Sequence, residues 1–173
     1  GIGLLIFSPI LILICLLVFS QERSVIFSQE RVGRNKKSFI LLKFRTMHKN
    51  TPSLASHLVK SSAVTKMGGF LRKSKLDELP QLLNVFKGEM SLVGPRPNLL
   101  NQKELIKHRD ALGIYSVRPG ITGLAQIKKI DMSKPKELAA LDKQMIEGLT
   151  IKKYFQYIFL TLRGVGLGDN LQG

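Results

Sequence analysis

The sequence is short of cysteine, tryptophan and acidic residues: it has one Cys, no Trp and 12 Asp and Glu among 173 residues. Because Cys15 is the single cysteine, the chain can form no intrachain disulfide and offers no cysteine set for a zinc site. A reducing compartment suits such a chain. Its length is enough for one compact domain and hardly for two.

The shortage of acidic residues leaves the chain strongly basic. Its 27 Lys and Arg give a net charge of +15, and 13 basic against two acidic residues lie between Gln21 and Lys75. This charge indicates an anionic partner, either nucleic acid or the phosphates of lipids and nucleotides. Without tryptophan, and without aromatic residues interleaved among the cations, the chain lacks the stacking platform of a nucleic-acid binder. We therefore expect no nucleic-acid partner.

The longest uncharged stretch is "LLIFSPILILICLLVFS", residues 4–20, part of an apolar run that begins at Ile2. As one helix, the run to Phe19 would be about 27 Å long, close to the hydrocarbon thickness of a bilayer. Pro9 disfavours that helix because it lacks an amide hydrogen, and the Ser8 hydroxyl can satisfy a freed backbone group. A break at Ser8-Pro9 predicts a hairpin that enters and leaves the membrane on one face. A crossing helix and a buried core helix remain alternatives.

Two short strands are predicted at residues 24–33 and 38–47, joined as a hairpin by the basic turn "RNKK". Residues 48–65 are polar and weakly patterned, which indicates a surface loop or a short helix. Apolar periodicity predicts helices over three further segments: 101–112, 135–149 and 149–166.

The last of these helices has an apolar stripe of four residues, namely Phe155, Ile158, Phe159 and Leu162. Cations flank the stripe. Such a helix either packs its stripe in the core or lies on a membrane surface. The sequence alone leaves both open.

The chemistry concentrates in "FLRKSKLDELPQLLNVFKGEMSLVGPRP", residues 70–97. Leucines at helical spacing predict a helix from about Asp77 to Phe86, with Pro80 in its first turn. Asp77 then stands at or beside the N-cap, where backbone amides and the helix dipole keep a carboxylate ionised and attract phosphate. The adjacent Glu78 completes a carboxylate pair, the type of hard oxygen ligand that Mg²⁺ requires.

An aspartate before a leucine-rich helix is ordinarily only a cap, so the surroundings of Asp77 matter. Arg72 precedes the pair, "GPRP" fixes Arg96 between two prolines, and "RPGITG" repeats that arrangement around Arg118. Cations on rigid turns near two carboxylates indicate a site that handles phosphate.

Three stretches together resemble the monotopic phosphoglycosyl transferases, bacterial sugar transferases that begin the assembly of surface glycans. They are "QERVGRNKKSFILLKFRTM", the segment 70–97 and "RPGITGLAQI", in the order and spacing of that family. The resemblance covers nearly the whole chain. It implies an α/β fold: a small mixed helix and strand catalytic domain at residues 21–173, with interfacial amphipathic helices. A re-entrant membrane helix at residues 1–20, broken at Ser8-Pro9, would hold the domain on the cytoplasmic face of the bacterial inner membrane.

The resemblance also implies an activity. Asp77 would attack the sugar-bearing phosphorus of a UDP-sugar and release UMP, and polyprenyl (undecaprenyl) phosphate would then accept the sugar phosphate. Glu78, with Asp77, would be a ligand of Mg²⁺. Four cations would contact substrate phosphates: Lys43, Arg72, Arg96 and, by its motif alone, Arg118.

Two features qualify the resemblance. Arg23-Ser24 stand where the family commonly has Gly-Pro, and no basic segment precedes the apolar run. A non-catalytic scaffold that binds anionic lipid with the same fold is the alternative function, because a fold alone does not guarantee activity. The motifs indicate neither the sugar nor the oligomeric state.

Overall fold

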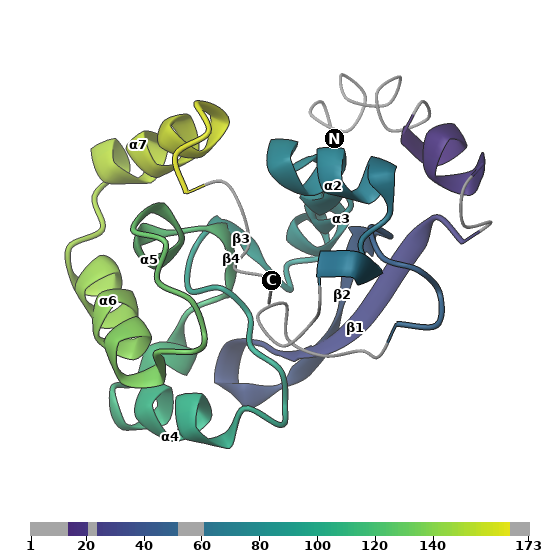
Figure 1. The fold of residues 1–173 in the computed structure, drawn as a ribbon. Helices are drawn as coiled ribbons and strands as arrows, with labels where there is room; N and C mark the ends of the chain where they lie inside the picture. The colour runs from purple at the N-terminus through teal and green to yellow at the C-terminus, as the bar shows by residue number, and fades with distance from the viewer. Residues whose placement is uncertain (1–13, 21–23, 52–60, 167–173) are drawn as a thin grey trace.

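The computed structural model describes residues 14–20, 24–51 and 61–166, and they form a domain of mixed helices and strands, as predicted (Figure 1). Figure 1 shows helices α4, α6 and α7 along one side of the molecule. The β1–β2 hairpin lies on the other side with α2 and α3, and β3 and β4 lie between the two groups. Ser8 and Pro9, and with them the predicted break, lie outside the described residues. Among the described helices, none has both the length and the apolar character to cross a bilayer.

The predicted hairpin is confirmed. β1 (Ile26–Val32) pairs antiparallel with β2 (Ser38–Phe44), in a register that sets Ile26 opposite Phe44 and Val32 opposite Ser38. The basic turn forms the short 3₁₀ helix η1 (Arg34–Lys36), in which Asn35 takes the left-handed conformation that asparagine tolerates.

The second pair of strands joins the two arginine-proline motifs. β3 (Ser91–Val93) runs parallel to β4 (Gly120–Thr122). Beyond the paired residues, Gly94 N donates to Thr122 O and Gly120 N donates to Pro95 O, both at 2.9 Å. A Cβ on Gly120 would lie 2.0 Å from Gly94 N. Glycine is therefore required here because the two backbones touch.

The prediction of one helix from Asp77 to Phe86 is wrong in its extent. After η3 (Ser61–Ala63) and a helix that the sequence did not predict, α2 (Lys66–Ser74), the chain forms η4 (Leu76–Glu78) and then α3 (Gln81–Phe86). Pro80 lies between them as the N-cap of α3, because it has no amide to continue an α-helix from η4. Because a 3₁₀ turn has fewer residues per turn than an α-helix, it also changes which side chains of α3 point inward. Gln81 is buried, and Phe86 is 72% exposed.

The remaining predicted helices are confirmed. They are α4 (Lys103–Ala111), α6 (Pro135–Glu147) and α7 (Ile151–Leu162), with the shorter η5 (Ile114–Ser116) and α5 (Leu124–Ile127) between α4 and α6.

The described part of the apolar run and α7 each bury some apolar side chains and leave others exposed. Residues 14–20 form a helix that buries Ile14 and Val18 against Phe44 and Leu71 and leaves Leu16 exposed. In α7 the buried residue is Tyr157. The stripe predicted for this helix is largely on the surface, since three of its members are exposed: Phe155 by 64%, Phe159 by 52% and Leu162 by 80%. The core interpretation is therefore wrong for these three residues.

Candidate active site

The carboxylate pair lies where α2 turns into η4. Lys75 ends α2 in the left-handed conformation, with φ 60° and ψ 11°, and its amide donates to Arg72 O. This sharp turn leads directly into Asp77 and Glu78, whose exposed fractions are only 4% and 6%. The flanking Leu76 and Leu79 pack on the cluster that contains Phe44 and Leu71. Apolar packing on both sides therefore holds two acidic side chains in the interior, where they need cationic partners.

Asn84 fixes α3 to the edge of the hairpin. Its Nδ2 donates to Ile40 O at 2.7 Å, and its Oδ1 accepts from Leu42 N at 3.1 Å. The fully buried amide thus occupies the free edge of β2 as a further strand would. It sets the distance between β2 and the segment that begins at Asp77.

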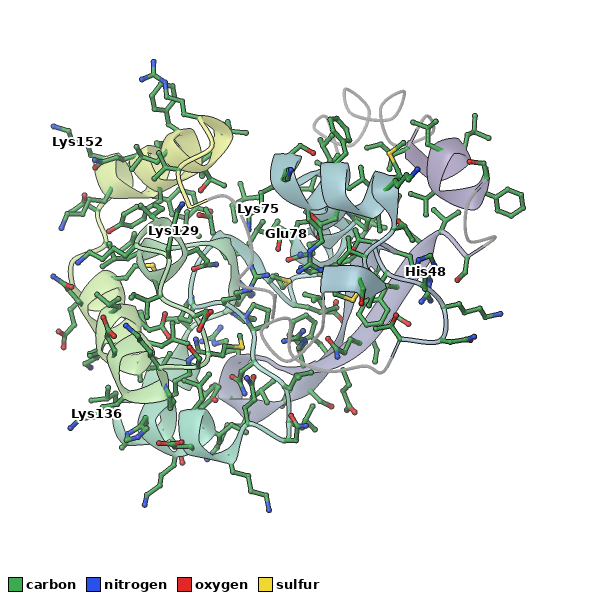
Figure 2. The ribbon with its side chains drawn as sticks, in the orientation of Figure 1. His48, Lys75, Glu78, Lys129, Lys136 and Lys152 are labelled. Atoms are coloured by element: carbon green, nitrogen blue, oxygen red, sulfur yellow. The ribbon has the colours of Figure 1, made fainter. Side chains whose placement is uncertain are left out.

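Lys43 of β2 and Arg96 of the "GPRP" turn converge on Glu78. Lys43 Nζ lies 2.9 Å from Glu78 Oε1, and Arg96 Nη2 lies 3.0 Å from the same oxygen. Lys43 Nζ is also 3.9 Å from Asp77 Oδ2. Residues far apart in the sequence thus place two cations at one carboxylate pair. Figure 2 shows Glu78 near the centre of the molecule.

The charge state of Glu78 follows from this arrangement. Burial by itself raises the pKa of Glu78, but the charges of Lys43, Arg96 and Lys75 outweigh burial and hold that pKa well below its ordinary value. Glu78 is therefore a carboxylate at neutral pH, and the cations around it are positioned before any substrate binds.

The structure brings together four of the six residues predicted for the site: Asp77, Glu78, Lys43 and Arg96. Arg72 is half-buried in the last turn of α2, next to the turn that leads to the pair. Arg118 is exposed, and within the described residues no ion pair or hydrogen bond joins it to either carboxylate. Its guanidinium instead lies beside Gly88.

Sequence reasoning missed Arg31, although it lies in the quoted motif "QERVG". Arg31 Nη1 donates to Pro97 O at 3.0 Å, next to Arg96. Burial and the nearby charge of Arg96 lower the pKa of Arg31 to about 9, with Glu78 partly opposing them. A central position in the motif was the signal that could have identified it.

The carboxylate pair fits Mg²⁺ only as a partial ligand set. The described residues contain no group of three or more His, Cys, Asp or Glu that could hold a metal. Mg²⁺ commonly binds one or two protein carboxylates and takes its other oxygens from water and substrate phosphates. Asp77 and Glu78 meet that requirement, provided that a phosphorylated substrate is present.

The arrangement suits phosphoryl transfer. A transferring phosphoryl group carries negative charge on its oxygens, which positioned cations stabilise without reacting themselves. A carboxylate beside them can act as a nucleophile toward phosphorus.

Comparison with known proteins agrees with this chemistry. The family model described as "Bacterial sugar transferase" matches residues 1–168. The exopolysaccharide production protein ExoY of Rhizobium meliloti (strain 1021) is 36% identical over 96% of this chain and 81% of its own length. The galactosyl transferase CpsE of Streptococcus agalactiae serotype III (strain NEM316) is 38% identical over 96% of the chain and 40% of its own length.

A further relative is the UDP-glucose:undecaprenyl-phosphate glucose-1-phosphate transferase of Caulobacter vibrioides (strain ATCC 19089 / CIP 103742 / CB 15). It is 40% identical over 71% of this chain and 48% of its own length. The chain thus spans less than half of the length of several curated relatives.

Proposed function

We propose, since the chain belongs to the bacterial sugar transferase family, that it transfers a sugar 1-phosphate from a UDP-sugar to polyprenyl phosphate and releases UMP. One observation carries the proposal: the buried Asp77-Glu78 pair faces Lys43 and Arg96. The name of the Caulobacter relative, a UDP-glucose:undecaprenyl-phosphate glucose-1-phosphate transferase, supports the donor and acceptor classes. Such a reaction would begin the synthesis of a surface glycan.

Asp77 is the nucleophile in this proposal. An Asp77 oxygen attacks the sugar-bearing phosphorus, the bond from that phosphorus to the bridging oxygen breaks, and UMP leaves with the electron pair. A phosphate oxygen of the polyprenyl acceptor then attacks the same phosphorus and frees the Asp77 carboxylate. The role falls to Asp77 because Glu78 Oε1 contacts both cations at 3.0 Å or less, which favours a binding role for Glu78.

The cations act on the charge of the reacting phosphates. Arg96 and Lys43 lie on two different elements, so they can contact oxygens on two sides of one phosphoryl group. Arg72 and Arg118 are proposed phosphate contacts on the weaker ground of the motifs that contain them. Glu78 and Asp77 would hold Mg²⁺, which when bound neutralises charge on the diphosphate.

We further propose that the chain works at the cytoplasmic face of the bacterial inner membrane, with membrane lipid as a partner. The exposed apolar residues of α7 and of the helix at 14–20 support a membrane contact. Both helices lie on the upper edge of the molecule in Figure 1, together with α2. The net charge of +15 suits the anionic cytoplasmic leaflet.

The test is UMP release by the detergent-solubilised chain with Mg²⁺ and polyprenyl phosphate, over a panel of UDP-sugars. Asp77→Asn is compared with Asp110→Asn, which removes a carboxylate in an exposed ion pair with Lys36. Without acceptor, the intact chain and Asp110→Asn should gain the mass of one sugar phosphate, and Asp77→Asn should not. Removal of Mg²⁺ with EDTA should stop release.

UMP release by Asp77→Asn at the rate of the intact chain would remove Asp77 from the covalent role. A chain that binds lipid vesicles but releases no UMP with any UDP-sugar would favour the scaffold.

A further inference from the structure

The turn that carries Arg96 is held at every backbone carbonyl from residue 95 to 98. Pro95 O accepts from Gly120 N, and Asn98 O accepts from Val32 N, both at 2.9 Å. The two carbonyls between them, those of Arg96 and Pro97, accept from arginine side chains. Because Pro95 and Pro97 have no amide hydrogens, these carbonyls are the principal backbone groups through which the turn can be fixed.

The two arginines bind consecutive carbonyls. Arg109 Nη1 donates to Arg96 O at 2.9 Å, and Arg31 Nη1 donates to Pro97 O at 3.0 Å. Arg109 also donates to Asn98 Oδ1 at 3.0 Å, and the same oxygen accepts from the hydroxyl of Tyr115. Arg109, with its five donors, can serve several acceptors from one side chain.

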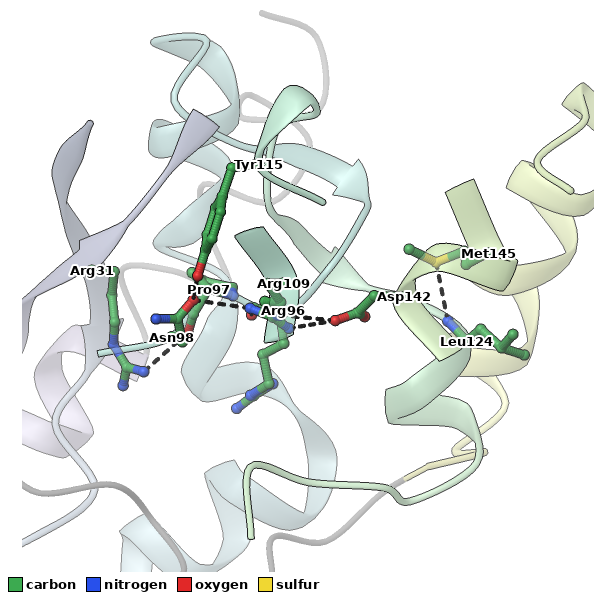
Figure 3. A network of polar contacts seen from close by, with 9 residues as sticks. All are labelled: Arg31, Arg96, Pro97, Asn98, Arg109, Tyr115, Leu124, Asp142 and Met145. Atoms are coloured by element: carbon green, nitrogen blue, oxygen red, sulfur yellow. Dashed lines mark hydrogen bonds and ion pairs between the residues drawn. The ribbon is translucent and has the colours of Figure 1, made fainter. Parts of the chain in front are cut away.

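Arg109 is itself anchored from a third element. It lies on α4, is 1% exposed, and donates to Asp142 of α6 through Nε at 2.9 Å and through Nη2 at 2.6 Å. Figure 3 shows Asp142, Arg109 and Asn98 in one row, with the Arg96 side chain turned away from them. The row therefore touches the backbone of Arg96 and leaves its guanidinium to reach Glu78.

We infer that Arg109, anchored by Asp142, is a positioning residue that sets the Arg96 turn for phosphate binding. The inference rests on the proposed function for the substrate phosphate. A buried ion pair adds little stability over apolar residues of similar volume, so stability alone does not explain this pair. A fixed Arg96 explains it, since a cation that is already in place stabilises phosphate without the cost of reorganisation.

The first experiment measures binding of UDP to the detergent-solubilised chain by titration calorimetry, because UDP has the donor's diphosphate and needs no turnover. Arg109→Lys keeps a charge opposite Asp142 but cannot donate to all the present acceptors. We expect it to weaken UDP binding at least about fivefold, with secondary structure unchanged by circular dichroism. A control on α6, Lys143→Gln with Glu147→Gln, removes an exposed ion pair and should bind UDP normally.

The second experiment separates positioning from a general structural role by combining Arg109→Lys with Arg96→Lys. If Arg109 acts through Arg96, the double variant should bind UDP within about twofold of Arg96→Lys alone. If the fold-losses in UDP affinity of the two single variants multiply in the double variant, the inference is overturned. Normal UDP binding by Arg109→Lys would also overturn it.

A third variant guards against misfolding. Arg109→Met with Asp142→Leu replaces the buried pair by apolar side chains, which should fold, with Tm close to that of the intact chain, and still bind UDP poorly. Normal UDP binding by this folded variant would overturn the inference. The proposed function fails differently: the intact chain would bind UDP but release no UMP.

Discussion

Lys43 Nζ and Glu78 Oε1 are 2.9 Å apart, although the two residues are separated by 35 positions in the chain. The contact joins the hairpin to the turn after α2, and it is largely shielded from solvent, since the exposed side-chain fractions of Lys43 and Glu78 are 16% and 7%. Because Arg96 contacts the same oxygen, Glu78 keeps its negative charge in a place where a lone carboxyl would take up a proton.

Glu78 should make stability depend on pH. Its pKa in the folded chain is well below the ordinary 4.5, so its contribution to stability is complete above pH 4.5 and falls as the pH drops below that value. The difference in unfolding free energy between the intact chain and Glu78→Gln should shrink by about 1.4 kcal/mol per pH unit below 4.5. Thermal unfolding from pH 7 to pH 3 measures it. The exposed Glu137→Gln should show no such trend, and a constant difference for Glu78→Gln would contradict the prediction.

Two adjacent glycines of α2 should respond in opposite directions to alanine. A Cβ on Gly68 would lie 2.0 Å from Thr46 O, whereas a Cβ on Gly69 would meet nothing within 4 Å. Gly68→Ala should therefore lower the unfolding free energy by about 3 kcal/mol or more, because backbone must move. Gly69→Ala should raise it by about 0.5–1 kcal/mol through helix propensity. Urea unfolding of both variants measures the pair, and equal effects would show that α2 can shift on Thr46.

Asn84→Leu should destabilise the chain and impair the site together. The leucine would leave Leu42 N and Ile40 O without their present side-chain partner, at a cost of about 3 kcal/mol. Since Lys43 follows Leu42 on β2, UMP release should fall as well. Asn101→Leu, at an exposed position, is the control for both measurements. Full UMP release together with lower stability would show that the contact of Asn84 with the edge of β2 does not position the site.

The exposed face of α7 should contact lipid. In a Cys15→Ala background, a fluorophore on Leu162→Cys should be quenched by nitroxide lipids in anionic vesicles, because Leu162 is 80% exposed and apolar. The same fluorophore on Glu147→Cys, at an exposed position of α6, should stay bright. Equal quenching at both positions, or none, would argue against a membrane contact through this helix.

Local patterns were enough to predict the hairpin and the helices α4, α6 and α7, because alternation and helical periodicity act within a few residues. The extent of the helix after Asp77 was wrong, since Pro80 favours a new start over a first-turn position. The sequence could not decide whether the α7 stripe is buried, because its burial depends on which other parts of the chain pack against it. Nothing in the local pattern of residues 101–112 distinguishes Arg109 from the other charged residues of that helix, because its pairing with Asp142, 33 positions away, is a product of tertiary packing.

The β3–β4 pair has a consequence for the order of folding. The two strands meet through Ser91 with Gly120 and Val93 with Thr122, so they close a loop of about 30 residues that contains α4. Closing such a loop costs roughly 3 kcal/mol of chain entropy before the few hydrogen bonds of the strand pair offset it. We therefore expect the hairpin to form early and the arginine-bearing turn late, so that the chain becomes competent to bind phosphate only in the last, non-local step of folding.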